Sequence, residues 1–222
     1  MSNLTALVTG ASRGIGAAIA EKFIQEGLRV LTPSRAELYL KSVTSIESFL
    51  KNLGQPVDVL VNNAGINILS DITEVANGDI QDTLQVNLVA PMQLIKGVAT
   101  QMMERRFGRI VNISSIWSVV SKKRRLTYAA SKAGLNGLTR TLAVELAPYN
   151  ILVNAVAPGY VNTELTRQNN SEQEISAICD TIPLQRLAEP KEIAEIVFFL
   201  CSDRNTYITG QLITVDGGFT CQ

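Results

Sequence analysis

Short hydrophobic runs alternate along the chain with longer segments in which apolar residues return at helical spacing. The predicted strands cover residues 4–9, 28–32, 57–61, 109–113, 151–156 and 212–215. Such apolar runs are typical of parallel strands buried on both faces. Predicted helices cover residues 17–25, 44–53, 79–103 and 127–147, and a last one starts at Pro190. This alternation predicts a single doubly wound α/β domain over residues 1–222, with a mostly parallel, seven-stranded sheet and helices on both faces.

Three segments modify this plan. Only residues 36–39 separate the loop after the second strand from Leu40, where a helix is usual, so we expect one flank of the sheet to be trimmed. The helix predicted over 79–103 is expected to bend or restart near Pro91. Residues 160–186 are polar and irregular, which is typical of a mobile lid over a site.

Composition is ordinary for a globular protein, with 222 residues, 46% hydrophobic and 18% charged. The 20 basic and 20 acidic residues balance, so bulk charge indicates neither a nucleic acid nor an acidic membrane as partner. The N-terminus lacks a basic region followed by an apolar run, and no run approaches the ~20 residues that span a bilayer. We therefore expect a cytoplasmic protein.

Two residue types limit the chemistry. Histidine is absent, which excludes Ser-His-Asp and Cys-His hydrolysis and histidine-based metal sites. Cys179, Cys201 and Cys221 are widely spaced and form no Cys-x-x-Cys pair, so we expect neither a disulfide framework nor a bound metal. Acid–base work at neutral pH is left to a carboxylate, a lysine, a cysteine or a perturbed tyrosine.

A tyrosine suited to this work lies in the segment Tyr128-Ala-Ala-Ser-Lys132. Positions i and i+4 share one face of a helix, so the Tyr128 hydroxyl and the Lys132 amine can reach the same volume. A nearby lysine cation favours the phenolate and lowers a tyrosine pKa from its usual value of about 10. The alternative is an ordinary exposed Tyr-Lys pair, so the choice depends on whether the chain also supplies a cofactor and a substrate.

A glycine-rich turn lies between the first predicted strand and the first helix, with glycines at 10, 14 and 16. In this context glycines let the backbone approach a pyrophosphate, which rests on the helix N-terminus. Residues after the second strand face the adenosine ribose, and here they include Ser34 and Arg35. With Arg13 in the turn, these groups suit a 2′-phosphate and favour NADP over NAD. The alternatives are a plain helix start and solvated arginines.

Polar and small residues follow the later strands. Asn63, Ala64 and Gly65 follow the strand at 57–61, Ser115 follows that at 109–113, and Pro158-Gly159 follows that at 151–156. Ligands of open α/β sheets bind at these carboxyl ends. Asn87 lies among apolar neighbours, as either a capped core residue or a site residue.

Together these motifs resemble the short-chain dehydrogenase/reductase family essentially from end to end. The motifs are TGASRGIG at 9–16, NNAG at 62–65, Asn87, Ser115, Tyr128 with Lys132, and Pro158-Gly159 followed by Thr163. The chain is most similar to the 3-oxoacyl-[acyl-carrier-protein] reductases of fatty acid biosynthesis. The resemblance implies a Rossmann-type fold, NADP(H) as cofactor, and a small-molecule or carrier-linked carbonyl substrate.

The resemblance also implies a role for each motif residue. Tyr128 would be the general acid in reduction, and Lys132 would lower its pKa and bind the nicotinamide ribose. Ser115 would hold the carbonyl oxygen, and Asn87 would hold a helix kink and a water of the proton relay. The other cofactor contacts would come from Gly10, Ser12, Arg13, Gly14, Ile15, Gly16, Ser34, Arg35, Leu40, Asn63, Ala64, Gly65, Pro158, Gly159, Val161 and Thr163.

The family pattern further implies a homotetramer, or a homodimer, that pairs the helices at 79–103 and 127–147. Val144 and Leu146, on the second of these helices, are compatible with such a pairing.

The chain departs from the family pattern in places. Besides the shortened flank, Tyr39 stands where many relatives have an aspartate that contacts adenine. Arg106 matches one of two arginines that dock an acidic carrier near the site mouth, but Tyr149 replaces the other. The run Lys122-Lys123-Arg124-Arg125 is either a solvated charge run or a device that steers an anionic substrate.

The leading hypothesis is an NADPH-dependent carbonyl reductase or alcohol dehydrogenase that acts on a 3-oxoacyl thioester. The first alternative is an oxidoreductase of a sugar, nucleotide sugar or polyol. The second is a non-catalytic, NADP-binding regulatory relative, which the intact Ser115, Tyr128 and Lys132 disfavour because a binding module has no use for all three.

Overall fold

The computed structural model describes residues 4–222, apart from the side chains at positions 165 and 169. Over these residues the chain forms one parallel sheet with the strand order β2-β1-β3-β4-β5-β6. The strands are β1 (Thr5–Val8), β2 (Arg29–Leu31), β3 (Val59–Asn62), β4 (Gly108–Ile113), β5 (Ile151–Pro158) and β6 (Leu212–Val215). The predicted fold class is therefore confirmed.

The predicted number of strands is wrong, because the described part of the chain forms a 6-stranded sheet rather than a seven-stranded one. After β2 the chain makes a turn over residues 35–37 and enters α2 (Val43–Lys51) directly. A crossover to a further parallel strand needs about 10–12 residues including its helix, and a strand besides. The segment 32–42 is too short for both, so β2 forms an edge of the sheet, and this flank is trimmed as predicted.

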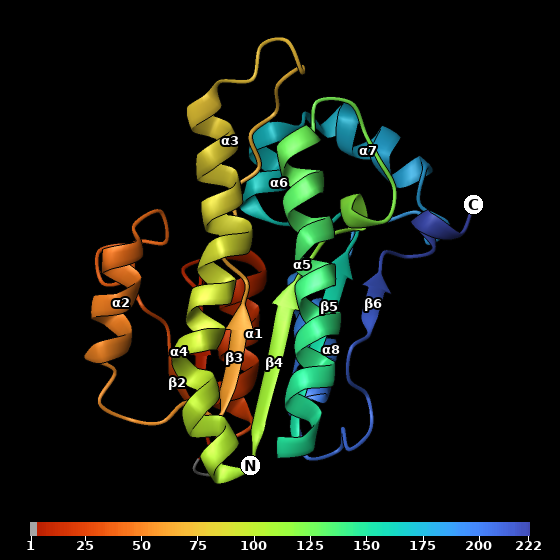
Figure 1. Cartoon of the computed structure of the whole chain (residues 1–222). Helices are drawn as coiled ribbons and strands as arrows, with labels where there is room; N and C mark the ends of the chain where they lie inside the picture. Colours follow the sequence, from red (N-terminus) through yellow and green to blue (C-terminus); the bar gives the residue numbers. More distant parts are fainter. Residues whose placement is uncertain (1–3) are drawn as a thin grey trace.

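Helices cover both faces of the sheet (Figure 1). One face carries α1 (Gly14–Gln25) and α8 (Pro190–Cys201), which pack together through an edge-to-face contact of Phe23 with Phe198 at 6.0 Å. The other carries α2, α4 (Ala90–Arg105) and α5 (Leu126–Leu146). Alternate strand residues serve the two cores, since Ala6 and Val8 pack in the first and Leu7 in the second.

The helix predicted over 79–103 is interrupted near Pro91 by a change of helix type. It consists of α3 (Asn77–Leu84), a π-helical turn at Gln85–Val89, and α4. Pro91 lies in the first turn of α4, where its missing N–H costs least. Figure 1 shows these three elements as one long ribbon in front of the sheet. Asn87 is the central residue of this π-turn.

The segment 160–186 is more regular than its pattern predicts. It contains α6 (Glu164–Asn169) and α7 (Glu172–Asp180), and α7 begins with a capping box between Ser171 and Glu174. Both helices lie at the end of the sheet toward which the strands point (Figure 1). Three short 3-10 turns complete the fold, at Ile116–Ser118, Ala147–Tyr149 and Phe219–Cys221.

No helix within the described residues is both long and apolar enough to cross a membrane.

Candidate active site

The site lies at the carboxyl ends of the strands, where the strand order reverses. From β1 the chain goes outward to β2 at the edge of the sheet, and it then returns past β1 to β3. The strand order therefore reverses between β1 and β3, and the loops after these two strands flank this switch point. Gly10 and Gly14 have φ values of 65° and 58°, which allow the turn after β1. A Cβ atom on Gly16 would lie 2.2 Å from the Gly10 carbonyl oxygen. The predicted glycine turn is therefore tightly packed at this edge.

Asn63 joins the loops after β1 and β3. Its Nδ2 atom donates hydrogen bonds to the carbonyl oxygens of Thr9 at 2.9 Å and Gly10 at 3.0 Å. The Thr9 hydroxyl in turn accepts from the backbone N–H groups of Asn63 at 3.0 Å and Ala64 at 3.1 Å. Asn63 therefore fixes the backbone conformation of the glycine turn.

The N-terminus of α1 is suited to an anion. No side chain caps it, and its first turn contains no acidic residue. The first N–H groups of an uncapped helix, with the positive end of its dipole, bind phosphate groups. Ser12, Gly14 and Ile15 surround this end, so the residues fit the pyrophosphate of a dinucleotide.

The residues predicted to hold a 2′-phosphate are already engaged in part. Arg13 pairs with Glu164 of α6 at 3.1 Å, and both side chains are exposed. The Ser34 backbone N–H donates to the Glu37 carboxylate at 2.8 Å, which lowers the Glu37 pKa. Arg35 is exposed in the loop after β2, beside the turn after β1. A phosphate would therefore compete with two carboxylates for these groups.

The adenine side differs from the family pattern. Tyr39 is exposed, and its backbone N–H donates to the Ser45 hydroxyl at 3.0 Å. The Leu40 carbonyl oxygen accepts a hydrogen bond from Gln85 at 3.1 Å. The Leu40 backbone is thus tied to the helix that carries Asn87.

Lys132 is buried in α5, and its Nζ atom donates a 2.6 Å hydrogen bond to the carbonyl oxygen of Ile113. Burial lowers the pKa of Lys132 to about 8. A Cβ atom added to Gly65 would lie 3.5 Å from this Nζ and 3.3 Å from Asn87 Oδ1. The structure therefore brings Gly65, Asn87 and Lys132 together.

Asn87 holds the loop after β3 with both ends of its amide. Its Oδ1 atom accepts from the Ile66 N–H at 2.8 Å, and its Nδ2 atom donates to the Ile66 carbonyl oxygen at 2.8 Å. Nδ2 also donates to the Ser131 hydroxyl at 3.1 Å. Asn87 thus links the π-turn, the loop after β3 and α5.

Tyr128 and Ser115 lie at the same end of α5 and β4. The Ser115 hydroxyl accepts from the Trp117 N–H at 3.2 Å and caps the 3-10 turn. Burial raises the pKa of Tyr128, while a hydrogen bond with Ser115 and the positive charge of Arg125 act in the opposite direction. Lys132 Nζ lies 5.6 Å from the centroid of the Tyr128 ring. The net shift of the tyrosine is upward, which is opposite to the shift that the sequence argument attributed to Lys132.

The predicted cofactor residues that follow β5, from Pro158 to Thr163, border the same edge. Pro158 ends β5, and a Cβ atom on Gly159 would lie 2.8 Å from the Asp216 Cα atom. Val161 forms an isolated parallel bridge with Ala188. The Thr163 hydroxyl caps α6 by accepting from the Thr166 N–H at 3.2 Å, and its methyl group faces Gly14.

Several polar residues of the site were missed by the sequence argument. Ser131 and Asn136 share a face of α5 with Tyr128 and Lys132, and Ser114 directly follows β4. The Ser114 hydroxyl donates to Asn136 Oδ1 at 2.7 Å, and the Ser131 hydroxyl donates to the Tyr128 carbonyl oxygen at 2.7 Å. Helical spacing from Tyr128 was the available signal for both α5 residues.

Two further expectations are not met. Arg106 lies at the C-terminal end of α4, beside the start of β4 and opposite the site, where its guanidinium donates to the Pro148 carbonyl oxygen at 2.9 Å. It does not flank the mouth of this chain's own site. Leu146 is buried in the core, so of these two residues only Val144, at 80% exposure, is available for a helix pairing.

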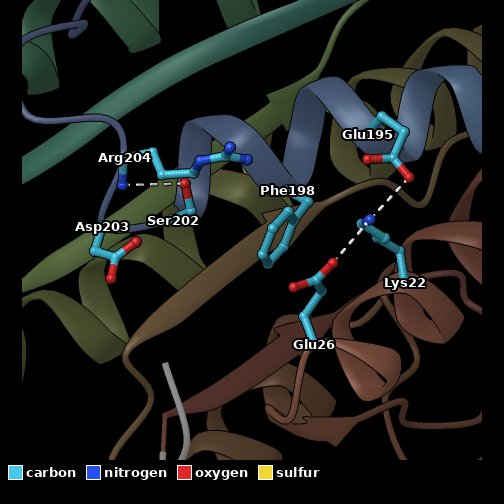
Figure 2. Close-up of a pocket in the computed structure, with 7 residues that line it drawn as sticks. All are labelled: Lys22, Glu26, Glu195, Phe198, Ser202, Asp203 and Arg204. Carbon is cyan, nitrogen blue, oxygen red and sulfur yellow. Dashed lines mark hydrogen bonds and ion pairs between the residues drawn. The ribbon is translucent and has the colours of Figure 1, made fainter.

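A surface hollow of about 320 Å³ lies between α1 and α8, away from the glycine turn. Lys22 bridges Glu26 at 2.9 Å and Glu195 at 2.8 Å across it (Figure 2). Arg204 and Asp203 border its other end. The hollow carries a surface ion-pair network and none of the predicted site residues.

Known proteins share both the sequence and the fold. The chain matches two family models, described as short chain dehydrogenase over residues 4–49 and as enoyl-(acyl carrier protein) reductase over residues 40–220. It is 38% identical over 234 aligned residues to the 3-oxoacyl-[acyl-carrier-protein] reductase FabG of Escherichia coli (strain K12), with 96% of each chain covered. It is also 38% identical over 237 residues to FabG of Aquifex aeolicus (strain VF5), covering 96% of this chain and 95% of the relative.

Solved structures agree with this relationship. One from Beutenbergia cavernae, described as an NAD(P)-dependent gluconate 5-dehydrogenase with bound NADP, has a TM-score of 0.93 and 35% identity and covers 100% of this chain and 98% of that chain. An actinorhodin polyketide ketoreductase with NADPH has a TM-score of 0.92 and 32% identity, covering 99% of both chains. This chain therefore belongs to the short-chain dehydrogenase/reductase family of oxidoreductases.

Proposed function

We propose that this protein is an NADP(H)-dependent oxidoreductase that interconverts a carbonyl and an alcohol. One observation carries the proposal: Tyr128, Ser115, Lys132 and Asn87 meet at the strand ends beside a glycine turn that fits a dinucleotide. The relatives support NADP(H) as the cofactor, since two solved structures of similar fold contain NADP or NADPH.

The cofactor would lie along the turn after β1. Its pyrophosphate would rest on the N-terminus of α1, between the glycines and Asn63. Arg13, Ser34 and Arg35 would hold the 2′-phosphate, and Leu40 and Ala64 would border the adenosine. Gly65, Lys132, Pro158, Gly159, Val161 and Thr163 would border the nicotinamide half. When bound, NADPH supplies the hydride that the reduction needs.

The protein side chains would position and protonate the substrate. The Ser115 hydroxyl donates a hydrogen bond to the carbonyl oxygen, and the Tyr128 hydroxyl gives that oxygen its proton as negative charge develops there. Burial keeps Tyr128 protonated at neutral pH, which suits an acid. Lys132 would bind the nicotinamide ribose. Asn87 would hold a water of the relay that returns a proton to Tyr128.

The leading substrate class is a 3-oxoacyl thioester. The support is the identity of 37–38% with reductases of 3-oxoacyl-[acyl-carrier-protein], over 96% of this chain. The second candidate is a sugar or sugar acid, favoured by the similar structure described as a gluconate dehydrogenase. The position of Arg106 away from the site also removes one argument for a docked carrier.

We further propose that segment 160–186 acts as a lid and that the protein assembles as a homotetramer, or a homodimer, in the cytoplasm. The helix pairing expected from the family would use α4 and α5, where Val144 is exposed. Light scattering on the purified protein tests the assembly.

A panel of carbonyl substrates from several chemical classes tests the proposed function. NADPH oxidation is followed at 340 nm with acetoacetyl thioesters, sugar acids, nucleotide sugars and simple ketones. Turnover of any class supports an oxidoreductase, and its preferred substrate selects between the candidates. Saturable NADPH binding without turnover of any carbonyl in the panel would favour the non-catalytic, regulatory alternative.

A further inference from the structure

The basic run Lys122–Arg125 separates into residues with different surroundings. Arg124 turns away from the site, with its Nε atom 3.7 Å from an Asp71 carboxylate oxygen and with a φ of 66°. Lys123 is exposed to solvent. Lys122 and Arg125 instead approach the ring of Trp117, at 5.9 Å and 5.1 Å from its centroid. The run is therefore more than a solvated stretch of charge.

Trp117 belongs to an aromatic cluster that closes one side of the site. Its ring makes edge-to-face contacts with Tyr160 at 6.0 Å and Phe219 at 6.1 Å, and these two rings contact each other at 5.7 Å. Lys122 Nζ donates to the Tyr160 hydroxyl at 3.1 Å. The Trp117 backbone N–H donates to the Ser115 hydroxyl, so the cluster is fixed relative to that hydroxyl.

Arg125 has a charge without a protein counterion. Its Nε atom is buried and has no hydrogen-bond partner among the residues that the structure describes. No described carboxylate lies within 4.0 Å of its guanidinium. Leaving a buried donor of this kind unpaired is unfavourable, so the surroundings of Arg125 favour an oxygen acceptor beside its guanidinium.

Arg125 lies close to Tyr128, the residue proposed to protonate the substrate. Arg125 precedes Tyr128 by three residues at the start of α5, and residues at this spacing are neighbours on a helix surface. Its positive charge lowers the Tyr128 pKa, against the larger upward effect of burial, so the guanidinium is close enough to act on the hydroxyl. No side chain caps the N-terminus of α5, so the helix end adds positive potential at the same place.

We propose that Arg125 binds an oxyanion of the substrate, a carboxylate or a phosphate, while Ser115 and Tyr128 hold the carbonyl. The planar guanidinium offers paired N–H donors that match either group, and Trp117 supports its face. A carboxylate would come from a free oxo acid, and a phosphate from the pantetheine arm or nucleotide of a thioester. The proposal rests on the proposed carbonyl chemistry but identifies a part of the substrate that this chemistry does not specify.

The first test measures binding without catalysis. Trp117 is the only tryptophan in the chain, so its emission reports a ligand at Arg125. Wild-type protein with NADP⁺ is titrated with two matched pairs: 3-oxobutanoate and its methyl ester, and acetoacetyl-coenzyme A and the neutral N-acetylcysteamine thioester. We expect the anionic member of one pair to bind at least ten times more tightly than its neutral partner. The pair that shows the preference identifies the oxyanion.

Variants assign that preference to Arg125. Arg125→Gln should reduce the ratio between the anionic and neutral ligands about tenfold, and Arg125→Lys should restore part of it. Lys123→Gln, which removes the same charge two residues away, should leave the ratio unchanged. Equal binding of both members of both pairs, or a ratio in Arg125→Gln equal to that of wild type, overturns the proposal.

A second readout separates this proposal from the proposed function. If the neutral ligands are reduced by NADPH but Arg125→Gln does not change the anionic-to-neutral ratio of kcat/KM, the oxidoreductase stands and the Arg125 site falls. If no ligand is reduced but the ratio of the dissociation constants of the neutral and anionic ligands, measured by fluorescence, depends on Arg125, the binding site stands and the proposed reaction falls.

Discussion

Lys132 Nζ donates a 2.6 Å hydrogen bond to the carbonyl oxygen of Ile113, the last residue of β4. This contact fixes a buried amine at the carboxyl end of the sheet, beside Gly65 and Asn87. Its pKa of about 8 means that most of the amine is still charged at neutral pH, in surroundings that disfavour the charge. Residues that cost stability while serving chemistry are typical of active sites.

The depressed pKa of Lys132 predicts a pH-dependent stability difference. The folded protein loses this proton near pH 8, whereas the unfolded chain keeps it until about pH 10.5. Below pH 8 the buried charge therefore lowers the free energy of unfolding. This destabilisation decreases as the pH rises from about 8 to about 10.5. Relative to Lys132→Met, the free energy of unfolding of the wild type should rise by about 2 kcal/mol between pH 7.5 and 9.5.

Urea denaturation of both proteins at the two pH values measures this difference. The comparison cancels the other titrating groups, which the two proteins share. A difference that does not change with pH would show that the Lys132 pKa is not lowered in the folded protein.

Pairing of Arg13 with Glu164 predicts that the Glu164 carboxylate weakens cofactor binding. A 2′-phosphate must displace the Glu164 carboxylate from the Arg13 guanidinium, and an exposed pair of this kind is worth up to about 1 kcal/mol. Glu164→Gln should therefore lower the Kd for NADPH up to about fivefold and change that for NADH little. Glu172→Gln, which removes a charge from the neighbouring helix α7, is the control. Equal changes for NADPH and NADH would place the 2′-phosphate elsewhere.

Arg35 is predicted to set the preference between the two cofactors. Arg35→Asp replaces a charge that suits the 2′-phosphate with one that repels it, and a carboxylate suits a free ribose hydroxyl. We expect the NADPH Kd to rise at least ~30-fold, as befits losing a charge-assisted hydrogen bond and adding repulsion, with a much smaller change for NADH. Arg204→Asp makes the same charge change at the hollow between α1 and α8 and should alter neither. Parallel losses for both cofactors would contradict the assignment.

The sequence predicted the features that depend on local patterns. All the strands that the structure describes were predicted within a few residues, and α8 begins at Pro190 as expected, because buried runs and helix starts leave local signals. An interruption of the long helix near Pro91 was also predicted, and it takes the form of the π-turn around Asn87. The motif residues from Gly10 to Thr163 lie along one edge of the sheet because parallel strands bring their carboxyl ends together.

Features that depend on distant contacts were missed or misjudged. The seventh strand was expected from the general plan, although the segment 32–42 has no room for it. The pKa of Tyr128 depends on burial, which spacing from Lys132 does not reveal. The cluster of Trp117, Tyr160 and Phe219 joins three parts of the chain that no periodicity connects. Leu146 was considered for an interface because its pattern does not show which helix face the core covers.

The most direct test of the account is the turnover of Tyr128→Phe. This change removes only the hydroxyl proposed as the acid and leaves the ring, the buried Lys132 and the glycine turn in place. General acid catalysis contributes about 10²–10⁴-fold to rate, so kcat for NADPH oxidation with the best substrate of the panel should fall by at least about 100-fold. The Kd for NADPH should stay within about threefold of the wild-type value, since the hydroxyl is proposed to act on the substrate. A variant that binds NADPH normally and keeps more than about a tenth of the wild-type kcat would contradict the assigned role of Tyr128.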